Sequence, residues 1–202
     1  MFGGMATGMT TRDAQRLATR ERLFDAAISE FKASGVAEAD VGAIVEAAGV
    51  AHGTFFFHFP TKAHVVAELG QREELRMAGE LERFLSSPRD LRSLLAEFLR
   101  MVRSMERRVG TVLFRELLAL YFSPTRPELR VWPDHPVIAR LIVEFDHARD
   151  RGELDAEADP VNSAMFFLLG LFALLITHER NVARAGVLEQ YVTTALRGLE
   201  PR

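Results

Sequence analysis

Apolar residues recur at helical spacing along almost the whole chain after residue 12. The first stripe occupies positions i, i+3, i+4 and i+7 and consists of Phe24, Ala27, Ile28 and Phe31. Gly35 stands where that helix would end, and Asp40 is a suitable N-cap for a short second helix. Later stripes predict helices over 62–85, 91–105, 114–121, 138–152, 160–176 and 188–199. Because no segment has a convincing strand pattern, the chain is predicted to be all-α.

The same pattern divides the chain into two predicted units. Residues up to about 60 form three short helices, and the remainder forms a larger helical bundle. Pro60 ends the third helix, and Thr61 is a suitable N-cap for the next one. Since the helical pattern resumes at once, we expect a rigid joint here and not a flexible linker. The Pro-rich segment 123–136 is the one long connection.

The longest apolar stretch, AMFFLLGLFALLI at 164–176, is short for a membrane span. A spanning helix needs about 20 apolar residues, whereas a run of about 10–14 is more often a buried core helix. We therefore expect no membrane partner. The first residues, MFGGMATGMTTRD, lack a basic start followed by an apolar core, so no signal peptide is predicted.

Composition limits the chemistry further. The chain contains no cysteine among its 202 residues, which excludes disulfides, thiolate catalysis and cysteine-ligated metals. That composition fits a reducing compartment, and the expected location is cytoplasmic. The net charge is −3, so any surface that binds nucleic acid must be local.

The segment GTFFFHFPTK at 53–62 places four phenylalanines together at the end of the first unit. In a helix, Phe55 and Phe59 share one face and are expected to pack in the core. Phe56 and Phe57 point elsewhere, and one short helix cannot bury every face. Half of these aromatic side chains therefore need a role other than core packing.

Segment 41–59, VGAIVEAAGVAHGTFFFHF, has the arrangement of a helix-turn-helix. Small residues end the first helix, Gly49 permits a sharp turn, and Val50 is an apolar plug within it. The second helix could then enter a DNA major groove, which is about 12 Å wide.

Residues 19–62 resemble the N-terminal domain of TetR-family transcriptional regulators. The matching pieces are TRERLFDAA, FKASG, IVEAAGV and GTFFFHFPTK, which occur in order and at the right spacing. Segment 159–172 also looks like the penultimate helix of that family. The resemblance implies a flexible basic arm over 1–18, a helix-turn-helix DNA-binding domain over 19–62, and a ligand-binding and dimerisation domain over 63–202.

The resemblance further implies a homodimeric repressor that binds a palindromic operator in double-stranded DNA. A two-fold dimer would place its recognition helices about 34–36 Å apart, which is one turn of DNA. The expected DNA-binding residues are Arg12, Arg16, Arg20, Val41, Gly42, His52, Gly53, Thr54, Phe56, Phe57, His58 and Lys62.

This chain departs from the family pattern at several of those positions. Phe56 replaces a tyrosine whose hydroxyl bonds phosphate, and Gly42 replaces a polar reader such as arginine. Residues 12–62 carry six basic and seven acidic side chains, so weak non-specific DNA binding is expected. One alternative is therefore a helical ligand-binding dimer that has weak or lost specific DNA binding.

For the second unit, the resemblance implies a hydrophobic small-molecule effector, no cofactor, and dimerisation through the last two helices. The bulky residues expected to line the effector site are Phe98, Met101, Met105, Phe114, Leu118, Phe122, Trp132, Phe145, Phe166 and Phe172. Candidates for a polar contact are Arg115, Glu116, His147 and His178, of which His178 belongs to the predicted site. Apolar stripes of this kind are also ordinary core.

An enzyme is the other alternative, because Glu144 and His147 have the i, i+3 spacing found in di-iron bundles. Such a site needs a second pair and carboxylates from two more helices, and the sequence has no second pair. Together with the absence of a nucleophile motif, this leads us to expect no metal and no enzymatic activity.

Overall fold

The computed structural model describes residues 10–121, 123, 135–177 and 182–201. Within these residues every regular element is a helix, and the all-α prediction is correct. The chain forms two compact units, Met1–Val65 and Val66–Arg202. The division falls inside the helix that spans residues 62–84.

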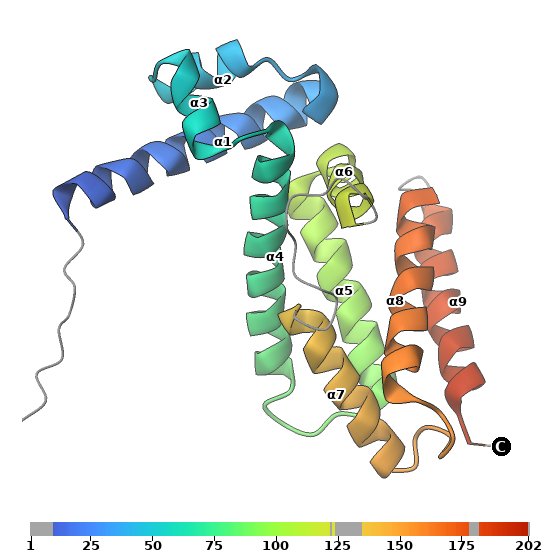
Figure 1. The fold of residues 1–202 in the computed structure, drawn as a ribbon. Coiled ribbons are helices and arrows are strands. Elements are labelled where there is room, and N and C mark those ends of the chain that lie inside the picture. The colour runs from blue at the N-terminus through green and yellow to red at the C-terminus, as the bar shows by residue number, and fades with distance from the viewer. Residues whose placement is uncertain (1–9, 122, 124–134, 178–181, 202) are drawn as a thin grey trace, which may run out of the picture. The chain divides into compact units, whose positions relative to one another are not determined.

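The first unit contains α1 (Thr11–Glu38), α2 (Val41–Ala48) and α3 (His52–His58) (Figure 1). A capping box starts α1, in which the Thr10 side chain accepts from the Asp13 backbone and Asp13 bonds back to Thr10. The expected flexible arm over 1–18 is therefore wrong for residues 11–18, which form the first turns of α1. The buried face of α1 consists of Leu23, Phe24, Ala27 and Phe31.

A kink at Gly35 interrupts α1. This glycine has φ 79°, in the left-handed region that side-chain-bearing residues rarely adopt. The helix was predicted to end here, whereas the chain makes a last short turn to Glu38. Asp40 then caps α2, as predicted, by accepting from the Gly42 and Ala43 amides at 2.8 and 3.3 Å.

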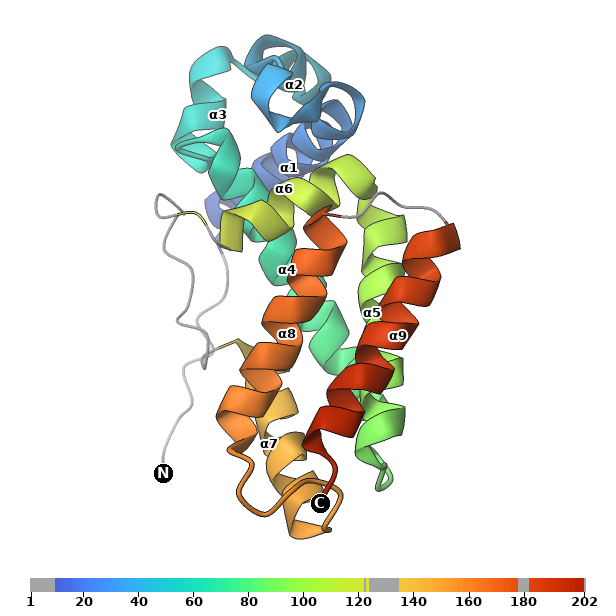
Figure 2. The same cartoon turned by 90° about the vertical axis from the view of Figure 1, so that its right-hand side faces the viewer.

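The second unit is a helical bundle. It contains most of α4 (Lys62–Phe84), followed by α5 (Leu91–Val109), α6 (Thr111–Tyr121), α7 (Pro136–Asp150), α8 (Pro160–Thr177) and α9 (Val182–Leu199). Helix α5 contacts α6, α7 and α9, and α8 contacts α6, α7 and α9. Figure 2 shows α8 and α9 side by side along the bundle.

Close contacts fix α9 against its two neighbours. Arg184 pairs with Glu106 of α5 at 2.8 Å, and both side chains are almost fully buried. The Tyr191 hydroxyl donates to the carbonyl oxygens of Phe166 and Phe167, at 3.2 and 2.8 Å. A Cβ at Gly170 would lie 2.3 Å from that hydroxyl, so a side chain at this position would prevent the approach of α8 and α9.

Helix α8 is apolar on every side. Its 18 residues have a mean hydropathy of 1.9, long and apolar enough to cross a membrane by composition, although a core helix meets the same criterion. One face, with Phe167, Leu168 and Leu171, is buried in the bundle. On another face Phe166 is 69 % exposed and Leu169 is 39 % exposed. This chain alone therefore leaves an apolar stripe of α8 uncovered.

Candidate DNA-binding helix and ligand cavity

The turn between α2 and α3 depends on Gly49. This residue has φ 65° and ψ 43°, and its amide bonds to carbonyl oxygens at the end of α2. The Val50 amide reaches back to the Val45 carbonyl at 3.0 Å, which closes a Schellman-type turn. The predicted turn glycine is thus in the left-handed conformation that such a turn requires.

The phenylalanines of the α3 segment differ in burial, as their spacing predicts. Phe55 and Phe59 are fully buried, with ring centroids 6.0 Å apart. Phe56 is 48 % exposed and Phe57 is 68 % exposed. Exposing two large aromatic side chains on one short helix is unusual for a surface without a partner.

Arg20 of α1 holds the end of α3 in place. Its guanidinium donates a hydrogen bond to the His58 carbonyl and lies 4.2 Å from the Phe59 ring centroid. Arg16, one turn earlier, lies over the exposed Phe57 ring at 5.4 Å from its centroid. Arg20, which was expected to bind DNA, therefore has a structural function, whereas Arg12 and Arg16 lie on the exposed surface of α1.

The last residue of α3, His58, is only partly covered. Burial, followed by the positive charges of Arg20 and Arg16, lowers the pKa of His58 below its ordinary value. At neutral pH the imidazole is therefore uncharged. His52 lies at the other end of the helix, exposed, with its ring centroid 5.8 Å from that of Phe56.

Lys62 was expected to bind DNA, and in the structure it bonds within the unit. Its ammonium donates to the carbonyl oxygens of Ala37 and Ala39, at 2.6 and 3.1 Å. These carbonyls follow the Gly35 kink and have no helical partner beyond the end of α1. Two of the three ammonium donors are thus used to close the unit.

The remaining predicted positions lie on the same two helices. Val41 and Gly42 are half-buried in the first turn of α2, and a Cβ on Gly42 would lie 3.1 Å from the capping Asp40 carboxylate. Thr54 is half-buried in α3. Gly53 is exposed and has nothing within 4 Å of a built Cβ, so its backbone is accessible to a partner.

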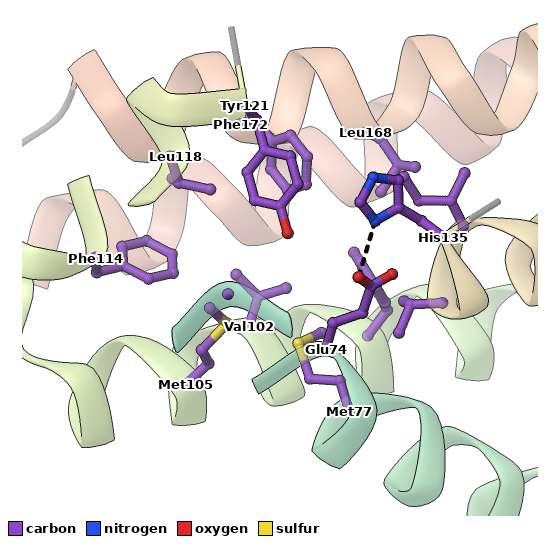
Figure 3. Close-up of a pocket in the computed structure, with 14 residues that line it drawn as sticks. Glu74, Met77, Val102, Met105, Phe114, Leu118, Tyr121, His135, Leu168 and Phe172 are labelled. Atoms are coloured by element: carbon purple, nitrogen blue, oxygen red, sulfur yellow. Dashed lines mark hydrogen bonds and ion pairs between the residues drawn. The ribbon is translucent and has the colours of Figure 1, made fainter. Parts of the chain in front are cut away.

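The second unit contains a small apolar cavity, drawn in Figure 3. Its volume is about 70 Å³. It is lined by Gly70, Glu74, Met77, Phe98, Val102, Met105, Phe114, Leu118, Tyr121, His135, Val137, Ile138, Leu168 and Phe172. On α5 the lining positions recur at i, i+4 and i+7, so one face of that helix forms a wall.

Three polar side chains line this otherwise apolar cavity. His135 Nδ1 lies 2.8 Å from Glu74 Oε2, and both side chains are largely buried. The Tyr121 ring meets the His135 ring at a centroid distance of 5.6 Å. Burial and the nearby Glu74 charge raise the pKa of Tyr121 well above its ordinary value, so the phenol keeps its proton.

The structure brings only part of the predicted ligand-binding set to this cavity. Phe98, Met105, Phe114, Leu118 and Phe172 line it. Met101 and Phe145 are packed in the core and do not line it, because they face other sides of α5 and α7. Phe166 is exposed on α8. Phe122, Trp132 and His178 lie outside the described residues.

The polar lining residues were missed in the sequence. Glu74 belongs to an acidic stretch that reads as a solvated helix face, and His135 ends the Pro-rich segment. The polar candidates proposed instead lie elsewhere: Arg115, Glu116 and His147 are absent from the lining. A helical projection that places Glu74 one turn after Gly70, on a buried face, would have suggested the first of them.

Glu144 and His147 contact each other within α7. Glu144 pairs with Arg140 at 2.9 Å and with His147 Nδ1 at 3.4 Å. Among the described residues no group of three or more His, Asp or Glu side chains could hold a metal ion. Contacts within α7 account for the spacing, because the buried Glu144 carboxylate is paired with Arg140 one turn earlier.

Comparison with known proteins agrees with the geometry of the first unit. Residues 23–69 match the family described as bacterial regulatory proteins, tetR family. The match includes α2 and α3, with Gly49 between them, and the part of α1 from Leu23 onward.

Two curated relatives carry the same assignment. The HTH-type transcriptional regulator AcrR of Shigella flexneri is 34 % identical over 91 residues, which is 45 % of this chain and 41 % of that protein. The probable HTH-type transcriptional regulator ArpR of Pseudomonas putida is 28 % identical over 200 residues, which is 93 % of each chain. The first alignment thus spans less than half of its relative.

A solved structure shares the fold over nearly the whole chain. Thermus thermophilus FadR, a TetR-family transcriptional repressor in complex with lauroyl-CoA, superposes with a TM-score of 0.69 at 22 % identity, covering 91 % of this chain and 96 % of that one. The two curated relatives are thus both named as transcriptional regulators. Over residues 23–69, which contain its helix-turn-helix, the chain therefore matches the TetR family of bacterial regulatory proteins, and its two curated relatives are named as HTH-type transcriptional regulators.

Proposed function

We propose that this protein is a homodimeric repressor that binds a palindromic operator through α3 and is released by a small hydrophobic effector. The observation that carries the proposal is the division of α3 into two faces. Phe55 and Phe59 anchor it in the unit, while Phe56 and Phe57 are exposed on the side available to DNA. The protein would act on DNA in the cytoplasm.

The exposed face of α3 suggests how the operator is read. It offers phenyl rings, and such rings contact the 5-methyl groups of thymine in the major groove. Arg12 and Arg16 are exposed on α1 and can contact phosphates, which position a protein without reading sequence. We infer that thymine methyl groups contribute much of the specificity of this protein.

Dimerisation through α8 and α9 is supported by the uncovered stripe of α8. Phe166, Leu169 and Val187 of the last two helices are exposed large apolar side chains. A second copy related by a two-fold axis would cover them in an intersubunit four-helix bundle. The apolar character of α8 is then explained without a membrane.

The effector is proposed to bind in the cavity of the second unit. The related FadR binds lauroyl-CoA, which supports a small-molecule role for this fold. The cavity here has a volume of about 70 Å³, below the roughly 150 Å³ of a cavity known to hold benzene. An effector must therefore displace side chains, and it regulates only if it binds the DNA-competent and released states with different affinity.

The direct test is selection of bound duplexes from random DNA, followed by sequencing and by titration of the best duplex at several salt concentrations. The proposal expects an enriched palindrome with half-sites about one helical turn apart. A Phe57→Ala variant should lose the enrichment, whereas Leu75→Ala, an exposed residue of α4, should keep it.

The alternative, a helical dimer without specific DNA binding, is supported by the bonds of two basic residues. Lys62 bonds to two carbonyls, and Arg20 bonds to the His58 carbonyl, so both have structural roles. Phe56→Tyr distinguishes the two functions. It should tighten operator binding of a repressor by supplying a hydroxyl for a phosphate. No enriched duplex at low salt, together with no effect of Phe56→Tyr, would favour the alternative.

A further inference from the structure

The polar residues of the cavity lie together on one side of an otherwise apolar wall. Of its fourteen lining residues, only Glu74, Tyr121 and His135 are polar. Figure 3 shows the Glu74 carboxylate and the His135 ring facing each other, with the Tyr121 hydroxyl pointing into the cavity. Three elements contribute them: α4, the end of α6, and the residue before α7.

The described lining residues include one acidic side chain and one histidine. Among the described residues that line the cavity, Glu74 is the acidic one and none is arginine or lysine, and the Tyr121 phenol stays neutral. The lining positions on α5, α7 and α8 have no ionisable side chain. Even with His135 protonated, these described lining residues carry no net positive charge, because Glu74 offsets the histidine, so an anionic group would gain no net attraction there.

The remaining walls suit a cation with an apolar body. Phe98, Phe114, Phe172 and Tyr121 offer aromatic rings, whose faces attract cations. Met77 and Met105 add flexible thioethers that can change rotamer to admit a compact ligand. A buried carboxylate beside aromatic rings compensates an ammonium group for the water it loses.

We propose that this cavity is selective for small lipophilic cations, in which an ammonium group binds the Glu74 carboxylate beside His135 and Tyr121 and an apolar body of about one ring fills the space toward Met105 and Phe114. The ammonium group would compete with His135 for the carboxylate. This deepens the proposed effector function and rests on it for its regulatory meaning, although ligand binding itself is independent of DNA.

The test uses three probes of nearly the same shape: 2-phenylethylammonium, 2-phenylethanol and phenylacetate. Their affinities for the full-length protein are measured without DNA by calorimetry, and by the methyl NMR signals of the methionines. We expect the ammonium probe to bind at least about tenfold more tightly than the alcohol, the difference expected for a charge-assisted hydrogen bond. Phenylacetate should be the weakest of the three.

The key variant is Glu74→Gln, which keeps the size of the side chain and removes its charge. It should abolish the advantage of the ammonium probe while leaving 2-phenylethanol binding nearly unchanged. Glu82→Gln is the matched control, because Glu82 is an exposed residue of the same helix and does not line the cavity. Circular dichroism checks that both variants fold.

Three results would overturn the proposal: phenylacetate binding as tightly as the ammonium probe, an ammonium advantage that survives in Glu74→Gln, or no binding of any probe at millimolar concentration. These results would leave the DNA-binding function standing, since that function is measured separately by duplex selection. Conversely, an ammonium-selective cavity in a protein that enriches no duplex would retain the site and remove its regulatory role.

Discussion

The guanidinium of Arg20 lies against the Phe59 ring and also donates a hydrogen bond to the carbonyl of His58. One side chain of α1 thus contacts both the buried anchor of α3 and the last turn of that helix. A residue that was expected to contact DNA therefore positions α3, the proposed recognition helix.

Replacing Arg20 by lysine keeps the charge and tests this positioning role. We expect Arg20→Lys to destabilise the protein by about 1–2 kcal/mol, because lysine cannot combine the same planar contact with the hydrogen bond. Urea denaturation measures this change. Arg12→Lys, on the exposed start of α1, is the control and should leave the midpoint unchanged. Equal effects of the two variants would show that Arg20 acts through charge alone.

Readout through thymine methyl groups predicts sensitivity to uracil. Replacing one contacted thymine by uracil removes a methyl group worth about 0.8 kcal/mol when buried, so operator affinity should fall about fourfold. In the Phe57→Ala variant the same substitution should cost less, because the ring that covers the methyl group is gone. Fluorescence anisotropy with the two duplexes measures both losses. Equal losses in the two proteins would place the methyl contact elsewhere.

Phe166 tests the proposed dimer. Because its ring is 69 % exposed on the apolar stripe of α8, Phe166→Glu should place a charge in the intersubunit bundle and dissociate it. Sedimentation equilibrium at micromolar concentration should then report a monomer. Leu75→Glu alters an equally exposed leucine of α4 and should stay dimeric. If Phe166→Glu is also a dimer, the interface uses another surface.

The close contact of α8 with α9 predicts a strong effect at Gly170. Gly170→Ala brings a methyl group against the Tyr191 ring and should cost about 1–3 kcal/mol through overpacking. Gly79→Ala in α4 is the control, since its Cβ would meet only the flexible end of Arg83 at 3.7 Å. Thermal unfolding measures the loss of stability in both variants. Adding Tyr191→Ala to Gly170→Ala should cost less than the sum of the single effects.

His58 predicts a pH dependence of stability. Its pKa in the folded protein lies below the unfolded value of 6.5, so the unfolded chain binds the proton first as pH falls. This contribution is therefore complete above about pH 6.5 and is lost as pH falls through the folded pKa. Between pH 8 and pH 5.5, wild type should lose more stability than His58→Gln, as measured by urea midpoints. His52→Gln, which changes an exposed histidine, should behave like wild type.

Periodicity predicted most of the fold because each helix buries a single face. The spacing of Phe55 and Phe59 placed both in the core, and Gly49 marked the turn. The start of α1 was missed, since its first turns are polar and depend on a capping box and not on an apolar stripe. A local bond between Thr10 and Asp13 leaves no periodic signal.

The contacts of the candidate sites were harder to predict from the sequence, because they join residues that are far apart along the chain. Lys62 bonds to carbonyls 25 and 23 residues earlier, and His135 pairs with a glutamate 61 residues earlier. The polar or charged character of each residue is visible in the sequence, whereas its partner is fixed only by packing. For the same reason, Met101 and Phe98 look alike in a list of bulky residues, although only Phe98 reaches the cavity.

The hydrogen bonds of Lys62 also indicate where a chimera between this protein and a relative should be joined. Lys62 is the first residue of α4, yet its ammonium closes the end of α1. A chimera joined at Pro60 would give those carbonyls a lysine from a foreign helix, or none. A chimera joined after Val65 transfers the lysine together with the carbonyls it serves. Exchange of recognition units between relatives should therefore succeed when the junction lies one turn inside α4.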